Sequence, residues 1–216
     1  KNPQFKLAND VAYDHITIDE HTEKIIDEAS ILYIGTLAQR NEITRNSLRE
    51  MLYTVDATII YDVNLREGVF DWKRIFIQTI PYVSILKMSS EEQEQVAKMY
   101  DVRVEELPDL LFNESERLHT IFITKGVEGA DVLTRNGKRE CEKPPAITAI
   151  DTTGCGDAFC AGIVKALVYE EDVKRQLQRG ILTAAVIAQH KGAIPDKIRF
   201  ETTLEAVSDT FLNNSG

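Results

Sequence analysis

The sequence Asp151-Thr152-Thr153-Gly154-Cys155-Gly156-Asp157-Ala158-Phe159 follows the apolar run 144–150 and precedes an amphipathic segment that predicts a helix over 158–169. Two glycines at the start of a helix leave backbone N–H groups uncovered and let a phosphate approach closely. The helix dipole favours the negative charge of that phosphate. Asp157 directly follows the glycines, where it would meet the group that attacks the phosphate. The stretch therefore suggests phosphoryl transfer as a working hypothesis.

Composition and charge exclude several classes of protein. The chain has 216 residues, of which 43% are hydrophobic and 28% charged, as in an ordinary globular protein. No apolar run is long enough to span a membrane, and the net charge of -10 argues against a nucleic-acid or anionic-membrane binder. Three cysteines without framework spacing indicate a reducing compartment, so we expect a cytoplasmic protein. The four histidines are scattered and lack the spacing of a zinc site.

Apolar strand-like runs alternate with amphipathic segments, which predicts an α/β fold: a doubly wound, mostly parallel sheet with helices on both faces, in one domain over 1–216. Asn136-Gly137 adds a hairpin signal. The expected strands are 31–34, 57–61, 83–86, 120–124, 131–134 and 138–142. The expected helices are 19–29, 44–53 (starting at Thr44 or Asn46), 72–79, 91–100, 104–111, 158–169, 172–190 and 200–212.

Polar residues follow three of these strands, at 62–66, 87–92 and 124–129, and the quoted stretch is the fourth such group. In open α/β sheets, ligands bind at the carboxyl ends of the strands. We therefore expect these four groups of residues to form one active site.

Other glycine-loop chemistries fit poorly. A P-loop requires GxxxxGK[ST], which does not occur. A dinucleotide-binding loop needs a small residue where this chain has Phe159, and it belongs to the first βαβ unit of a domain. The remaining alternative is a glycine-rich helix start without a ligand, in which Asp157 is only a first-turn acid that favours the dipole.

The stretch 151–159 resembles the DTxGAGDxF signature of the ribokinase-like (PfkB) carbohydrate kinases, with Cys155 in place of alanine. The resemblance extends from about Phe5 to Pro195. It includes a D-x-N-x-R segment at 62–66, a K-x-[NS]-x-x-E segment at 87–92 and a T-x-G-x-x-G turn at 124–129. The strings 11–14 and 35–40 look most like the fructokinase branch.

The resemblance implies an ATP-dependent kinase that transfers the γ-phosphoryl group to a sugar hydroxyl, with fructose as the expected acceptor. Ribose, 2-keto-3-deoxygluconate and nucleosides stay open as acceptors, and so does a catalytically inactive nucleotide-binding module. By the same resemblance, Asp157 is the base. The anion hole comprises the N–H groups of Gly154, Cys155 and Gly156, and the sugar or the transferred phosphate is bound by Asn64 and Arg66.

The resemblance also implies cofactor residues. Those for ATP are Lys87, Ser89, Glu92, Thr124, Gly126, Gly129 and Ala185, and Glu92 also holds Mg²⁺ through water. Those for a monovalent cation, K⁺, are Asp151, Thr153 and the backbone near Gly192. Simpler roles compete: Ser89 as a helix cap, the glycines as turn formers, Ala185 as a packing residue, and Cys155 as a small buried residue rather than a reactive thiol.

Family members carry an acidic sugar ligand, a Gly-Gly pair and a β-strand lid in a segment that would precede Lys1. We therefore expect the chain to be the C-terminal part of a longer sugar kinase. Its expected partners are a sugar and ATP, with no nucleic acid or membrane. A homodimer is expected if the lid is present.

Overall fold

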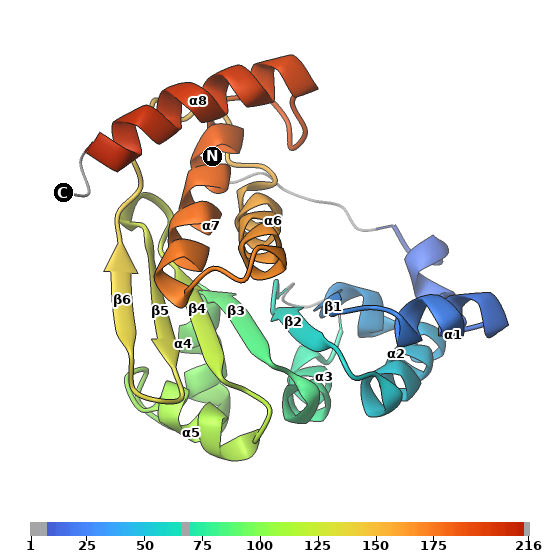
Figure 1. Ribbon diagram of the computed structural model, residues 1–216. Coiled ribbons are helices and arrows are strands. Elements are labelled where there is room, and N and C mark those ends of the chain that lie inside the picture. Colours follow the sequence, from blue (N-terminus) through green and yellow to red (C-terminus); the bar gives the residue numbers. More distant parts are fainter. Residues whose placement is uncertain (1–7, 66–69, 214–216) are drawn as a thin grey trace. The chain divides into compact units, whose positions relative to one another are not determined.

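The computed structural model describes residues 8–65 and 70–213 (Figure 1). Contacts divide the chain into two compact units. Unit 1 comprises residues 1–86 and 94–118, and unit 2 comprises residues 87–93 and 119–216. The strands have the order β1-β2-β3-β4-β5-β6.

Unit 1 contains two parallel strands, β1 (Ile31–Gly35) and β2 (Thr58–Asp62), paired so that Gly35 lies opposite Asp62. Continuous apolar runs such as Ile59 and Ile60, both fully buried, are typical of a parallel strand covered on both faces. The first half of β3 (Ile85–Ser89) also belongs to this unit. Its helices and turns are η1 (Ala12–Asp14), α1 (Glu20–Asp27), η2 (Leu37–Arg40), α2 (Glu42–Thr54), α3 (Trp72–Thr79), η3 (Ile80–Tyr82) and α5 (Leu107–Glu114).

Helix α2 begins earlier than its sequence signals suggest. Its N-cap is Asn41, whose Oδ1 accepts a hydrogen bond from the Ile43 N–H at 2.9 Å, rather than Thr44 or Asn46. Thr44 is buried instead, where its hydroxyl accepts from the Ile16 N–H and donates to the Tyr13 carbonyl. The tertiary contact therefore determines the role of Thr44, and the predicted start was wrong.

Unit 2 contains the antiparallel strands β4 (Thr120–Thr124), β5 (Ala130–Thr134) and β6 (Arg139–Glu142). The predicted hairpin is confirmed, and Gly137 in its turn has a φ of 85°. The remaining elements are the start of α4 (Ser90–Tyr100), η4 (Gly126–Glu128), α6 (Cys155–Val168), α7 (Val173–Ala188) and α8 (Lys197–Asn213).

Helices α6 and α7 lie side by side because two glycines allow close approach (Figure 1). A Cβ at Gly162 would lie 2.5 Å from the Arg179 carbonyl oxygen, and one at Gly180 would lie 2.8 Å from the Phe159 ring. The Phe159 ring in turn packs edge-on against Phe122 of β4, with centroids 5.9 Å apart. These contacts fix the N-terminus of α6 relative to β4.

Candidate active site

The quoted stretch forms the N-terminus of α6. The helix begins at Cys155 rather than at the predicted Ala158, so Cys155, Gly156 and Asp157 form its first turn. Gly154 is the N-cap, with a φ of 82°, and a Cβ there would lie 2.6 Å from the Ala193 Cβ. Both the left-handed backbone and the close approach therefore require glycine at this position.

The first turn of α6 offers backbone donors. The Cys155 N–H donates to the Thr152 carbonyl at 3.2 Å. Within the described residues, the N–H groups of Gly156 and Asp157 have no backbone acceptor. Of the three predicted anion-hole donors, the Cys155 N–H would first have to leave Thr152, whereas the N–H groups of Gly154 and Gly156 have no backbone acceptor among the described residues.

Lys87 places a cation beside this turn. It lies on β3 and is only 6% exposed, and its Nζ would be 3.3 Å from a Cβ at Gly156. The Lys87 ammonium group thus lies at the N-terminus of α6, beside a glycine whose backbone no side chain covers. This arrangement suits a phosphate. The sequence predicts that both segments belong to one site, and the fold shows which of their atoms adjoin.

Asp157 and Cys155 have different environments. The Asp157 side chain is exposed, as a base that meets a substrate must be. Burial raises the pKa of the half-buried Cys155 thiol, and the Asp151 carboxylate raises it further. The thiol donates to the Ala184 carbonyl at 3.6 Å. These contacts keep Cys155 protonated and support its role as a small packed residue rather than a reactive thiol.

Asp151 joins two segments at the start of this site. Its Oδ1 accepts from the Thr153 N–H at 3.0 Å and its Oδ2 from the Gly192 N–H at 2.9 Å. These backbone hydrogen bonds lower the pKa of the Asp151 carboxyl group. The fold therefore brings together the three residues expected at a monovalent-cation site, around an ionised carboxylate.

Ser89 and Glu92 form a capping box at the start of α4. The Glu92 N–H donates to Ser89 Oγ at 3.2 Å, and the Ser89 N–H donates to Glu92 Oε2 at 2.8 Å. This reciprocal pair is the structural role that the sequence allows for Ser89. Because β3 ends at Ser89, the pair follows Lys87 closely along the chain.

The turn after Thr124, the last residue of β4, contains glycines with two different constraints. Gly129 has a φ of 99°, and a Cβ there would lie 2.0 Å from the Glu142 carbonyl oxygen, so packing against β6 requires glycine. Gly126 has a φ of 57°, and nothing lies within 4 Å of its Cβ position. Gly126 therefore leaves open space beside the backbone, as a bound nucleotide would need.

The remaining predicted residues are Ala185, Asn64 and Arg66. Ala185 belongs to a buried cluster with Val186 of α7 and Val207 of α8, so helix packing accounts for its small side chain. Asn64 lies in unit 1 with a left-handed φ of 38°, a conformation that clusters at functional sites. Arg66 lies outside the described residues.

Two features are absent from the described residues. No group of three or more histidine, cysteine or acidic side chains is placed to hold a metal ion. No described helix is long and apolar enough to cross a membrane.

Known proteins resemble the chain over most of its length. It is 28% identical over 191 residues to the 2-dehydro-3-deoxygluconokinase of Haemophilus influenzae, covering 80% of this chain and 57% of that protein. It is 24% identical over 208 residues to the probable fructokinase-3 of Arabidopsis thaliana, covering 88% of this chain and 57% of that protein. The chain thus spans just over half the length of these relatives.

Solved structures share the fold. An uncharacterised sugar kinase from Pyrococcus horikoshii in complex with ATP has a TM-score of 0.77 at 24% identity, covering 95% of this chain and 68% of that one. A putative ribokinase II from E. coli in complex with ATP and Mg²⁺ has a TM-score of 0.74 at 16% identity, covering 85% and 61%. These similarities confirm the predicted ribokinase-like α/β fold. The model of the pfkB family of carbohydrate kinases matches residues 4–199, and the chain belongs to that family.

Proposed function

We propose that this protein transfers the γ-phosphoryl group of ATP to a hydroxyl group of a sugar, with fructose as the acceptor. The observation that carries the proposal is the N-terminus of α6, where Lys87 Nζ would lie 3.3 Å from a Cβ at Gly156 and Asp157 stands exposed in the same turn. A cation, backbone donors and a carboxylate are the groups that in-line phosphoryl transfer needs.

In the proposed reaction the Asp157 carboxylate accepts the proton of the attacking sugar hydroxyl. The hydroxyl oxygen forms a bond to the γ-phosphorus as the bond to the ADP oxygen breaks. The N–H groups of Gly154 and Gly156, and that of Cys155 once it leaves the Thr152 carbonyl, stabilise the charge on the transferred group. A preorganised donor of this kind is worth about 3–4 kcal/mol. Lys87 holds the phosphates in line.

The nucleotide side of the proposal uses the residues around β3 and β4. Ser89 and Glu92 would contact the phosphates, and Thr124 with Gly126 would lie against the nucleotide, where Gly126 leaves open space. Oxygen donors such as the Glu92 carboxylate fit Mg²⁺, which usually keeps several waters and would neutralise charge between the β- and γ-phosphates.

Two further sites complete the proposal. Asp151, Thr153 and the backbone at Gly192 would hold K⁺, supported by the ionised carboxylate that joins them. Asn64 and Arg66 would bind the sugar. We also propose a cytoplasmic location, supported by the absence of disulfides among the three cysteines.

The relatives include a 2-dehydro-3-deoxygluconokinase and a probable fructokinase at similar identity, so the acceptor needs a direct test. A coupled ADP-release assay should therefore compare fructose, ribose, 2-dehydro-3-deoxygluconate and a nucleoside. We expect turnover with fructose to have the highest kcat/KM. Higher kcat/KM with another acceptor would reassign the substrate, and ATP binding without turnover of any acceptor would favour an inactive nucleotide-binding module.

Replacing the base tests the mechanism. Asp157→Ala should lower kcat by about 10²- to 10⁴-fold, the usual contribution of a positioned base, while ATP affinity measured by calorimetry stays within about twofold. Asp109→Ala, which removes an exposed first-turn aspartate from α5, should leave both values unchanged. Near-normal kcat in the Asp157 variant would refute the mechanism.

A further inference from the structure

Unit 2 contains a cavity of about 380 Å³ that the proposed chemistry does not use. It lies between α7, the last turns of α8 and the connection from α6 to α7. Small-molecule sites usually have volumes of about 300–1,000 Å³ and a mostly apolar lining with a few polar groups. This lining combines two apolar side chains, Leu182 and Phe211, with charged and polar ones. The cavity therefore has the size and the mixed character of a ligand site.

The charged end of this cavity is separate from the proposed phosphate site. Helix α6 begins at that site with Cys155, whose thiol contacts the Ala184 carbonyl of α7. The lining residue Arg175 lies about 13 Å from Ala184 along the axis of α7, at about 1.5 Å per residue. The carbonyl of Arg179, which also lines the cavity, faces Gly162, about two turns along α6 from Cys155. A ligand held at Arg175 would therefore leave the proposed phosphate site open.

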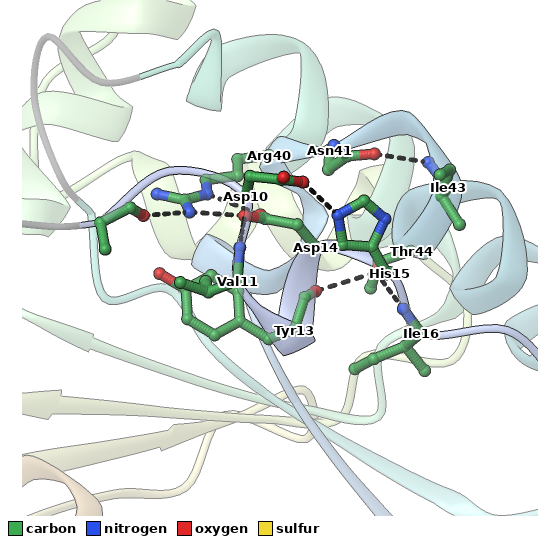
Figure 2. A network of polar contacts seen from close by, with 11 residues as sticks. Asp10, Val11, Tyr13, Asp14, His15, Ile16, Arg40, Asn41, Ile43 and Thr44 are labelled. Atoms are coloured by element: carbon green, nitrogen blue, oxygen red, sulfur yellow. Dashed lines mark hydrogen bonds and ion pairs between the residues drawn. The ribbon is translucent and has the colours of Figure 1, made fainter.

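Arg40 and Arg179 each form a two-pronged pair with a carboxylate. Arg40 of unit 1 donates through Nε and Nη2 to the two oxygens of Asp14 (Figure 2). Arg179 donates through the same two atoms to Glu171 at the wall of the cavity. These hydrogen bonds hold the pKa of Glu171 below its ordinary value. The charges of Arg179 and Glu171 therefore compensate each other.

Arg175 has no such pair among the described residues. Its Nη1 lies 3.3 Å from Gln178 Oε1, a neutral acceptor, and no partner of its Nε or Nη2 is found in the described part of the chain. Gln178 is only 8% exposed, and its Nε2 donates to Glu142 Oε2 at 3.2 Å, so its amide is fixed at both ends. The Ser208 hydroxyl of α8 likewise has no partner within the described ranges. The wall thus presents one uncompensated guanidinium group and one hydroxyl donor.

The lining favours a singly charged anion with an apolar part. The planar guanidinium group of Arg175 can bind a carboxylate through two parallel hydrogen bonds. A group with two negative charges would also face the Glu171 carboxylate, and a cation would face two guanidinium groups. The side chains of Leu182 and Phe211 offer a surface on which a hydrocarbon tail would leave water.

We propose that this cavity binds a small carboxylate with a hydrocarbon tail. Arg175 and Ser208 hold the carboxylate, and Leu182 and Phe211 contact the tail. The proposal is independent of sugar phosphorylation, because it concerns binding within unit 2 at a place away from the proposed phosphate site. ATP and the carboxylate should therefore bind at the same time.

Calorimetric titration of the full chain with octanoate tests the proposal, and butyrate and 1-octanol test the tail and the charge separately. Octanoate should bind more tightly than butyrate, by up to roughly fourfold for each additional methylene group. It should bind at least about tenfold more tightly than 1-octanol, which has the same chain length but no charge. Saturating ATP should leave the affinity for octanoate unchanged.

Arg175→Gln removes the charge from an exposed position of α7 and keeps a polar side chain there. It should weaken octanoate binding about tenfold and leave 1-octanol binding unchanged, because only the carboxylate contacts the guanidinium group. Lys174→Gln is the matched control, since it removes the same charge from the neighbouring exposed residue, outside the lining. This control should bind octanoate as the unaltered chain does.

Ser208→Ala tests the second donor and should weaken octanoate binding about fivefold. Its control, Thr202→Ala, removes a hydroxyl from an exposed position of the same helix and should leave the affinity unchanged. Urea unfolding should give the same midpoint for each variant and its control, so that a loss of affinity is not a loss of folding.

Four results would overturn the proposal. The first is no octanoate binding, and the second is unchanged octanoate affinity in both Arg175→Gln and Ser208→Ala. The third is equal affinity for octanoate and 1-octanol, or tighter binding of inorganic phosphate, which would make the cavity a purely apolar pocket or a general anion site. The fourth is displacement of octanoate by ATP, which would place the carboxylate at the nucleotide site.

Discussion

Gly154 and Gly156 are two residues apart, but a side chain added at each position would meet a different constraint. Gly154 combines a left-handed φ with a Cβ position 2.6 Å from the Ala193 Cβ. Gly156 is helical, and its Cβ position lies 3.3 Å from the end of a flexible lysine side chain. The first glycine is therefore needed for the fold, and the second for the position of Lys87.

Alanine substitutions should separate these roles. Gly154→Ala should lower the free energy of unfolding by roughly 2–4 kcal/mol, because backbone strain and overpacking add. Gly156→Ala should keep the stability within about 1 kcal/mol, since alanine favours a helix, but should lower kcat at least about tenfold by displacing Lys87. Urea unfolding and the ADP-release assay measure the two effects.

Gly137→Ala is the control for strain, because Gly137 has a similar φ of 85° but nothing within 4 Å of its Cβ position. It should cost less stability than Gly154→Ala and leave kcat unchanged. Equal losses at positions 137 and 154 would mean that the contact with Ala193 carries no energy. Unchanged kcat in Gly156→Ala would contradict the role given to Lys87.

At the scale of elements, the Ser89 side chain has two roles at the start of α4. It caps the helix, and in the proposed function it also contacts ATP. Ser89 Oγ accepts from the Glu92 N–H, and the Glu92 carboxylate accepts from the Ser89 N–H. A phosphate contact would need the Ser89 hydroxyl as well. Capping and binding can be separated because they depend on different properties of the side chain.

Replacing Ser89 tests this dual role. Ser89→Ala should lose about 1 kcal/mol of stability and bind ATP more weakly. Ser89→Asn should keep the stability, because asparagine is a good cap, but should bind ATP as weakly as the alanine variant, because the hydroxyl is gone. Urea unfolding and calorimetry with ATP give the two values.

Asp19→Ala removes the cap of α1, where Asp19 Oδ1 accepts from the Thr22 N–H at 2.8 Å. It should lower the stability to a similar extent without changing ATP affinity. If Ser89→Asn bound ATP as tightly as the unaltered chain, capping would be the whole role of Ser89.

At the scale of the whole molecule, acid stability should depend on the pair of Asp14 and Arg40. The Arg40 guanidinium hydrogen bonds lower the pKa of Asp14 to about 2 from a usual 3.8, against the opposing effect of burial. A carboxyl group with a lowered pKa contributes stability above its unfolded value and loses that stability as the pH falls through its folded value. The contribution should therefore be complete above about pH 4 and decline toward pH 2.

Urea unfolding between pH 7 and about pH 2 measures this effect against the double variant Asp14→Asn/Arg40→Gln, which removes both charges together. The difference in unfolding free energy between the two proteins should be constant from pH 7 to about pH 4 and should then shift against the unaltered chain. If the difference in unfolding free energy stayed constant down to pH 2, Arg40 would not lower the pKa of Asp14 in the folded protein.

Local signals predicted much of the fold. Apolar runs and caps predicted α3, β4 and the hairpin at Gly137, because these depend on residues close together in the sequence. Boundaries were wrong where a distant contact decides them: Thr44 is held by Tyr13 and Ile16, so α2 begins at Glu42 instead. Helix α6 also begins earlier than predicted, at Cys155, so that Gly154 is its N-cap and Gly156 lies in its first turn.

The sequence by itself determined the family, since its motifs appear in order along one chain, and it placed two glycines at the start of the helix that carries Asp157. Sequence motifs and the family resemblance grouped the first two of the following pairs at common sites, but only the tertiary structure decided the contacts themselves: Lys87 lies beside Gly156, Asp151 binds the backbone of Gly192, and Arg40 pairs with Asp14. These pairs are 69, 41 and 26 residues apart in the numbering. Periodicity and capping act over a few residues, whereas such contacts form only when packed helices and strands bring distant segments together.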